Sequence, residues 1–137
     1  VDDRCSKVEL RAVKRSCDPP WLAFGTQCYL SINKTITLPF DEAEAHCQGL
    51  SKPGKPAHLA SVADSTENRF IYDFAMSAGL GNYWIGYNDQ AEERNYVWTD
   101  GSTKTGYDNW HAYTREPSNV RSENCVNVCL GALRHVE

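Results

Sequence analysis

The chain has 137 residues, of which 41% are hydrophobic, and it carries a formal net charge of -4 with a sequence pI near 5.5. This length suits one domain with a hydrophobic core and leaves no room for a second. The negative charge argues against nucleic acid as a partner, because phosphate-backbone binding needs a clustered positive field, but it does not exclude a neutral ligand.

Six cysteines in a chain of this length indicate disulfides and an oxidising compartment, because their number is even and no Cys-x-x-Cys pair is present. Asn33-Lys34-Thr35 is an acceptor sequence for N-linked glycosylation, which agrees with secretion. No apolar run approaches membrane-spanning length, so we expect no membrane insertion by this chain. The sequence begins at Val1 without a signal peptide, and we expect that a targeting segment was removed or left out. We therefore expect a secreted, extracellular protein.

Residues 1–16 are charged and irregular, and we expect them to form an exposed N-terminal extension. Cys5 would tether this extension either within the chain or to another chain, which leaves an oligomer open. The domain itself is then expected to span residues 17–137.

The segment from Cys17 to Leu30 is predicted to be a hairpin, with Pro19-Pro20 turning the chain. Cys17 and Cys28 stand at its two ends, so we predict a disulfide between them. Bridging a loop this short stabilises a fold by roughly 3 kcal/mol in the chain-entropy model.

Two helices are predicted from the spacing of apolar residues. The first covers residues 39–50, with a proline suited to the first turn and a buried face at Phe40, Ala43, Cys47 and Leu50. Cys47 therefore points inward and needs a disulfide partner. The second helix begins after Asp64, which has capping-box spacing to Glu67, and ends at Gly79.

Apolar and β-branched runs predict strands over residues 28–32, 58–62, 83–87, 96–99 and 124–130. An acidic turn at residues 88–94 joins the third of these strands to the fourth. Residues 100–123 form a long polar segment with embedded aromatic residues. A segment of this length without regular structure is usually functional or disordered, and the aromatic residues favour an ordered loop.

The stretch Arg115–Cys125 concentrates hard oxygen donors, the ligand type that calcium prefers. The donors are Glu116, Ser118, Asn119, Glu123 and Asn124. A cis bond before Pro117 would direct the side chains on both sides of it toward one point. The alternative is an ordinary polar surface turn, because Glu, Pro, Ser and Asn are common turn residues.

These pieces, in this order, resemble the C-type lectin-like domain from Cys17 to about Cys125. The segments that carry the resemblance are Cys17 and Cys28 with Trp21 between them, Phe40–Cys47, His58–Val62 before Glu67–Ile71, Trp84-Ile85-Gly86, Trp98–Ser102, Asn109-Trp110, Glu116-Pro117-Ser118 and Glu123-Asn124-Cys125. The resemblance implies an α+β fold in which two helices pack on a small, mostly antiparallel sheet below a long calcium-binding loop.

The same resemblance implies a calcium-assisted sugar site. In sugar-binding members, Glu-Pro-Asn accompanies mannose-type ligands and Gln-Pro-Asp accompanies galactose-type ligands, so the glutamate of Glu116-Pro117-Ser118 favours the mannose type. Glu116, Ser118 and Glu123 would contact the sugar. The metal ligands over two calcium positions would be Asp89, Glu93, Glu116, Ser118, Asn119, Glu123 and Asn124. For Asp89 and Glu93 the alternative is a solvated hairpin turn.

The chain departs from the family at its C-terminal end. The usual Trp-Asn-Asp segment, which would supply two further calcium ligands, is absent after Cys125. Either the domain is truncated, so that its C-terminal strand is missing, or this segment is deleted and the ending is rearranged. The family pattern would pair Cys47 with a final cysteine that this chain lacks, and would pair Cys125 with the cysteine before it, for which Cys129 is the only nearby candidate. The sequence itself leaves three pairings open for Cys5, Cys47, Cys125 and Cys129.

Two functions follow from the resemblance. The first is a secreted, calcium-dependent lectin that binds glycans or a glycoprotein, with a mannose-type preference. The second is a calcium-independent, protein-binding domain of the same fold without a working sugar site, which the absent ligands favour. We do not expect an enzyme: His46 and Cys47 diverge on a helix, and no nucleophile-elbow glycines surround Ser61 near His58 and Asp64.

Overall fold

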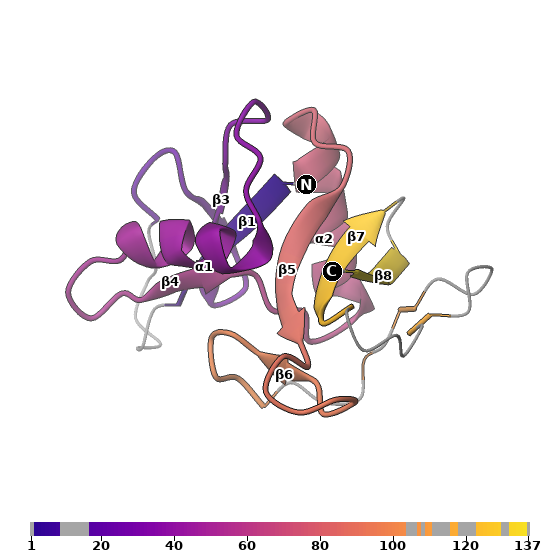
Figure 1. Ribbon diagram of the computed structural model, residues 1–137. Coiled ribbons are helices and arrows are strands. Elements are labelled where there is room, and N and C mark those ends of the chain that lie inside the picture. The colour runs from indigo at the N-terminus through magenta and orange to yellow at the C-terminus, as the bar shows by residue number, and fades with distance from the viewer. Residues whose placement is uncertain are drawn as a thin grey trace.

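The computed structural model describes residues 2–8, 17–103, 107, 109–110, 116–117, 123–129 and 132–136, with the backbone alone for 2–8, 129 and 132–136 (Figure 1). The elements are, in chain order, β1 (Asp2–Val8), β2 (Leu22–Phe24), β3 (Gln27–Ser31), α1 (Phe40–Gly49), β4 (Ala57–Leu59), α2 (Ser65–Ser77), β5 (Tyr83–Asn88), β6 (Val97–Trp98), β7 (Cys125–Cys129) and β8 (Ala132–Val136). The described strands form one sheet in the order β2-β3-β1-β5-β7-β8, with β4 paired to β1 and β6 paired to β5. All pairs are antiparallel except β1 with β5, which confirms the predicted α+β fold.

The two helices cover opposite faces of the sheet around β5. Tyr83 and Ile85 of β5 belong to a core cluster that includes Ile71 and Ala75 of α2. Trp84, which points the other way because side chains alternate along a strand, belongs to a second cluster with the α1 side chains Phe40, Ala43 and Cys47. The apolar residues whose spacing predicted α1 therefore form the buried face of this helix.

Helix α2 begins as the sequence predicts. The Asp64 carboxylate accepts a hydrogen bond from the Glu67 amide at 2.8 Å, which satisfies one of the unpaired donors of the first turn. Glu67 is itself buried, and its carboxylate accepts hydrogen bonds from the Ala63 amide at 2.6 Å and from the Tyr29 hydroxyl. This residue therefore joins the helix start to β3.

The expected N-terminal extension is wrong for residues 2–8. They form β1, which lies between β3 and β5 in the sheet and also pairs with β4. Strand pairing uses backbone amides and carbonyls, which every residue except proline provides, so a charged segment can still pair on both sides. The domain therefore begins before residue 17, whereas residues 9–16 lie outside the described part.

The C-terminal strand is present. Residues Ala132–Val136 form β8, which pairs antiparallel with β7 from Cys125↔Val136 to Cys129↔Ala132. Of the two alternatives drawn from the sequence, a missing terminal strand is wrong, and the ending is a hairpin that follows Cys125 directly.

The described cysteines settle part of the disulfide pairing. Cys17 and Cys28 are bonded with 5.7 Å between their Cα atoms, as predicted. Cys47 is also in a disulfide. Cys125 is a free, buried thiol. A Cys125–Cys129 bond is excluded because both residues lie in β7, where four residues span about 13 Å, well beyond the roughly 7 Å limit for a disulfide.

Candidate functional site

The acidic turn of residues 89–94 is fixed to the segment that enters β7. The Asp89 amide donates to the Asn124 carbonyl at 3.1 Å, and the Asp89 carboxylate accepts from the Arg94 amide at 2.8 Å. Arg94 closes the turn with a φ of 68°. Two predicted ligands, 35 positions apart in the chain, are therefore neighbours, because β5 and β7 are adjacent strands.

Three of the predicted ligand carboxylates act electrostatically on Tyr96. Burial raises the pKa of the Tyr96 hydroxyl well above its ordinary value, and the negative charges of Asp89, Glu93 and Glu116 raise it further. We refer to this end of the sheet, where β5 stops and the acidic turn begins, as the carboxylate end.

An aromatic cluster connects the carboxylate end to the long loop. The rings of Tyr87 and Trp98 stack with centroids 4.4 Å apart, and Tyr96 lies 5.0 Å from Tyr87. Trp110, from the long segment between β6 and β7, packs edge-on against Tyr96 at 5.3 Å. These contacts hold residue 110 of the long segment against β5 and β6, as the embedded aromatic residues predicted.

The Glu116–Pro117 peptide bond is cis, and both residues are half-buried. Glu123 and Asn124 are also half-buried, whereas Glu93 is exposed. Ser118 and Asn119 lie outside the described residues. The structure thus brings Asp89 beside Asn124, and Asp89, Glu93 and Glu116 lie within electrostatic range of Tyr96.

The donor chemistry of the carboxylate end fits calcium, which takes oxygen ligands from carboxylates, amides and backbone carbonyls. In the part of the chain that the structure describes, no three His, Cys, Asp or Glu side chains lie close enough together to hold a metal ion. The described carboxylates therefore act on Tyr96 but do not form a metal coordination shell by themselves.

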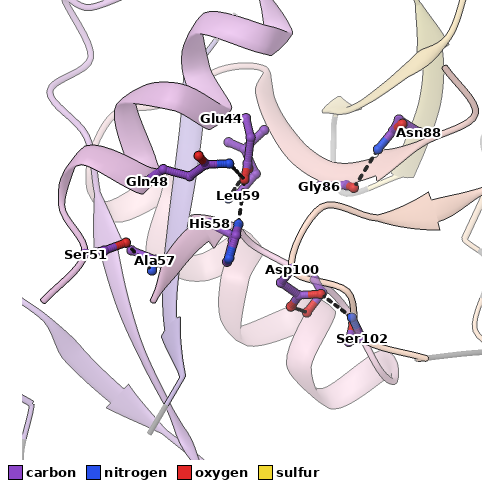
Figure 2. Close-up of polar contacts among 11 residues, drawn as sticks. Glu44, Gln48, Ser51, Ala57, His58, Leu59, Gly86, Asn88, Asp100 and Ser102 are labelled. Carbon is purple, nitrogen blue, oxygen red and sulfur yellow. Dashed lines mark hydrogen bonds and ion pairs between the residues drawn. The ribbon is translucent and has the colours of Figure 1, made fainter. Parts of the chain in front are cut away.

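Two amide side chains brace the carboxylate end, and sequence reasoning missed both. The Asn88 amide donates to the Gly86 carbonyl at 3.2 Å (Figure 2) and to the Val97 carbonyl at 3.4 Å, so it ties β5 to β6. The Gln90 amide donates to the Asp41 carboxylate at 3.1 Å, which links the acidic turn to the first turn of α1. The sequence offered one signal for the Asn88 contacts, because this asparagine is the polar last residue of an otherwise buried, mostly apolar strand.

The free thiol of Cys125 lies beneath this turn. Burial raises its pKa to about 12, and the negative charges of Asp41 and Asp89 add to the rise, while a hydrogen bond with Gln90 acts in the opposite direction. The thiol is therefore almost entirely protonated at neutral pH.

The long segment between β6 and β7 begins near Asp100, whose side chain is held in place by hydrogen bonds. Its carboxylate accepts hydrogen bonds from the Ser61 hydroxyl at 2.5 Å and from the Ser102 amide at 2.8 Å (Figure 2). Gly101 has a φ of 73°, a conformation that glycine adopts without steric cost. The Trp98–Ser102 motif is thus a tight turn attached to the residues that follow β4.

The side chains that could have formed a catalytic site make other contacts in the fold. The His58 ring contacts the Glu44 carboxylate at 2.6 Å, and Figure 2 shows this pair with Gln48 at the junction of α1 and β4. Ser61 donates to Asp100, and Asp64 caps α2. Ser61, His58 and Asp64 therefore do not form a nucleophile–base–acid triad.

A cavity of about 460 Å³ lies apart from the carboxylate end, between the β2–β3 turn and the start of α2. Its lining includes Phe24, Gln27, Asp64 and Glu67. The two carboxylates already serve as helix cap and as acceptor for Tyr29, so the polar groups in this cavity are explained by the fold.

Comparison with known proteins establishes the family. The family model "Lectin C-type domain" matches residues 36–135, so the chain belongs to the C-type lectin domain family. This confirms the resemblance drawn from the sequence, and it classes the chain with proteins that generally bind ligands without catalysis.

The alpha-N-acetylgalactosamine-specific lectin of Patiria pectinifera is 38% identical over 113 residues, which cover 80% of this chain and 64% of that protein. The chain therefore spans just under two thirds of that relative's length. The crystal structure of the C-type lectin CEL-I from Cucumaria echinata superposes with a TM-score of 0.79 at 26% identity, covering 88% of this chain and 89% of that one. A calcium-independent type II antifreeze protein has a TM-score of 0.75 at 25% identity, covering 92% of this chain and 88% of that one.

Within the described residues, no helix is long and apolar enough to cross a membrane.

Proposed function

We propose that this chain is a secreted, calcium-dependent lectin that binds glycans at the carboxylate end. The observation that carries the proposal is the hydrogen bond that sets the buried Asp89 beside Asn124, with Glu93 and Glu116 also within electrostatic range of this end of the sheet. Carboxylates gathered at one place repel one another, and a divalent cation relieves that repulsion. The Cys17–Cys28 disulfide supports an oxidising, extracellular setting.

Bound calcium would supply open coordination positions that two neighbouring sugar hydroxyls can fill, because the ion takes six to eight oxygens. The remaining contacts to the sugar and to the metal would come from the chain's own residues. Glu116 and Glu123 would accept hydrogen bonds from those hydroxyls, and Ser118 would donate or accept through its single hydroxyl. Asp89, Glu93, Asn119 and Asn124 would complete the metal ligands.

The sugar preference is the finer part of the proposal. Glu116-Pro117-Ser118 retains the glutamate of the mannose-type pattern, so we propose a mannose-type ligand. The relative from Patiria pectinifera is named for alpha-N-acetylgalactosamine, a galactose-type sugar. Both sugar types therefore belong in the binding test.

The test measures binding of the full chain to immobilised mannose and N-acetylgalactosamine, with calcium and with chelator, for the wild type and two variants. Glu116→Gln removes the charge of the proposed ligand with little change in shape. The matched control, Glu42→Gln, makes the same change at an exposed residue of α1 that belongs to neither proposed ligand set. We expect mannose binding that requires calcium and is lost or moved toward the galactose type in Glu116→Gln. Mannose binding that persists in chelator, or that ignores Glu116→Gln, would rule out the calcium mechanism.

A calcium-independent, protein-binding domain is the second candidate. It is favoured by the lack of a three-residue metal cluster among the described side chains and by the fold's likeness to a calcium-independent type II antifreeze protein. Calorimetric titration with calcium alone separates the two candidates, because only the lectin proposal requires heat of binding without sugar.

A further inference from the structure

The Asn33-Lys34-Thr35 turn, between β3 and α1, is one motif that the proposed lectin site does not use. The acceptor triplet Asn-x-Ser/Thr occurs only here in the sequence. All three residues are exposed and lie outside the helices and strands. Ile32 is buried on one side and Ile36 packs against the α1 core cluster on the other, so the turn is anchored while its triplet faces solvent.

The side chains of the triplet are arranged around the acceptor amide. The Thr35 amide and the Thr35 hydroxyl both donate to Asn33 Oδ1 at 3.0 Å, and the Ile36 amide donates to the Asn33 carbonyl at 2.9 Å. Both side-chain contacts use the oxygen of the Asn33 amide. The nitrogen Nδ2, which is the atom that an N-linked glycan modifies, takes no part in them.

We infer that Asn33 is the attachment site of an N-linked glycan. The co-reactant is a lipid-diphosphate-linked oligosaccharide, which the transferase of the secretory compartment supplies. A bond forms between Asn33 Nδ2 and the anomeric carbon of the first sugar, and the bond from that carbon to the diphosphate oxygen breaks. The lipid diphosphate leaves with the bonding electron pair, and the amide gives up one proton to a base of the transferase.

Three other asparagines show why exposure matters. Asn68, Asn88 and Asn127 are at most 9% exposed, so a folded chain withholds their amides from any enzyme. Asn33 combines the required third-position hydroxyl with an exposed side chain in a turn.

The glycan would stand at the end of the molecule opposite to the carboxylate end. The Lys34 side chain lies over Gly79, just after α2, where an added Cβ would be 3.4 Å from Lys34 Cδ. Figure 1 shows the connection from β3 to α1 beside this end of α2, with β6 at the other end of β5. Six residues of β5 separate the two ends by about 20 Å. The glycan therefore leaves the carboxylate end uncovered, a consequence that matters only if the proposed lectin function holds.

The experiment expresses the full chain with a secretion signal in eukaryotic cells and compares electrophoretic mobility before and after peptide N-glycosidase. The variants are Asn33→Gln, Thr35→Ala, Thr35→Ser and the control Asn95→Gln, which changes an exposed asparagine outside any acceptor triplet. We expect one glycan in the wild type, Thr35→Ser and Asn95→Gln, and complete loss in Asn33→Gln and Thr35→Ala. Peptide mass spectrometry directly detects the conversion of Asn33 to aspartate that peptide N-glycosidase causes when it removes the glycan.

A secreted, disulfide-bonded wild type without the mobility shift would overturn the inference, as would a shift that survives Asn33→Gln. Formation of the Cys17–Cys28 bond in each variant verifies that loss of the shift is not misfolding. Calcium-dependent glycan binding, measured before and after native deglycosylation, is expected to stay the same. Failure of the lectin proposal would abolish binding in both samples and leave the mobility shift intact, so the two failures are distinguishable.

Discussion

Gly86, in the middle of β5, has no room for a side chain, and Gly86→Ala should destabilise the fold. A Cβ built there lies 2.5 Å from the Thr99 hydroxyl oxygen, 3.0 Å from the Leu59 carbonyl and 3.3 Å from the Thr99 amide. Two of these contacts are with backbone, which cannot rotate away. The Gly86 amide also donates to Ala60 and its carbonyl accepts from Thr99, both at 2.9 Å.

The expected loss of unfolding free energy in Gly86→Ala combines opposing contributions. Overpacking a buried site costs about 1–3 kcal/mol. Weakening the two flanking backbone hydrogen bonds adds about 1–3 kcal/mol if either group is left unpaired. Alanine restricts the unfolded chain more than glycine does, which returns about 0.4–1 kcal/mol. The net loss of unfolding free energy therefore lies between about 1 and 6 kcal/mol with a central value of about 3 kcal/mol, a large share of the roughly 5–15 kcal/mol of a typical domain.

Urea unfolding measures this loss. With a slope of about 2 kcal/mol per molar urea, the midpoint should fall by about 1–2 M while the slope stays constant. Gly49→Ala is the matched control, because nothing lies within 4 Å of its added Cβ and it ends α1, where alanine is favoured by up to about 1 kcal/mol. Removing the nearest atom in Gly86→Ala/Thr99→Ala should recover part of the loss. A midpoint unchanged in Gly86→Ala, or lowered equally in Gly49→Ala, would refute the steric account.

Four further outcomes are expected. Glu67→Ala should lower the unfolding free energy by about 1–3 kcal/mol in the same assay, because it removes the acceptor of the Ala63 amide, whereas the Tyr29 hydroxyl keeps Gln27 as an acceptor; Glu67→Gln should cost less. Cys125 should resist alkylation in the native protein and react once unfolded; equal rates would contradict its burial. Its raised pKa also predicts stability that is complete below the unfolded thiol's pKa near 9 and is lost as pH rises toward about 12, a slope that Cys125→Ala should reduce. Glycan binding should fade in mild acid, because Glu116 and Glu123 must be ionised to bind metal; binding at pH 4 equal to that at pH 7 would contradict this.

The elements with strong local patterns were predictable. The apolar face of α1, the cap of α2 at Asp64 and the buried strand β5 follow from spacing and from side-chain chemistry within a few residues. The Cys17–Cys28 bond followed from two cysteines at the ends of one short turn. In each case the information is local, so a single sequence is enough.

The N-terminal strand and the site geometry were less accessible. β1 is charged, and its place between β3 and β5 depends on backbone pairing with distant segments, for which residues 2–8 carry no side-chain signal. Asp89 and Asn124 meet only because β5 and β7 are neighbours, which the family resemblance implied and periodicity could not. The braces at Asn88 and Gln90 depend on a side chain's direction in three dimensions, and an amide has no characteristic spacing.

The placement of the Lys34 side chain over Gly79 has a practical consequence for sensors and imaging reagents. A dye or chip surface coupled at the Asn33–Thr35 turn would hold the protein by the end of β5 where the strand begins, and the carboxylate end would face the sample. Coupling through the accessible carboxylates would consume Glu93 or Glu116 and would orient the protein the other way. Site-directed attachment at position 34 is therefore the geometry in which an immobilised copy keeps its candidate binding face in solution.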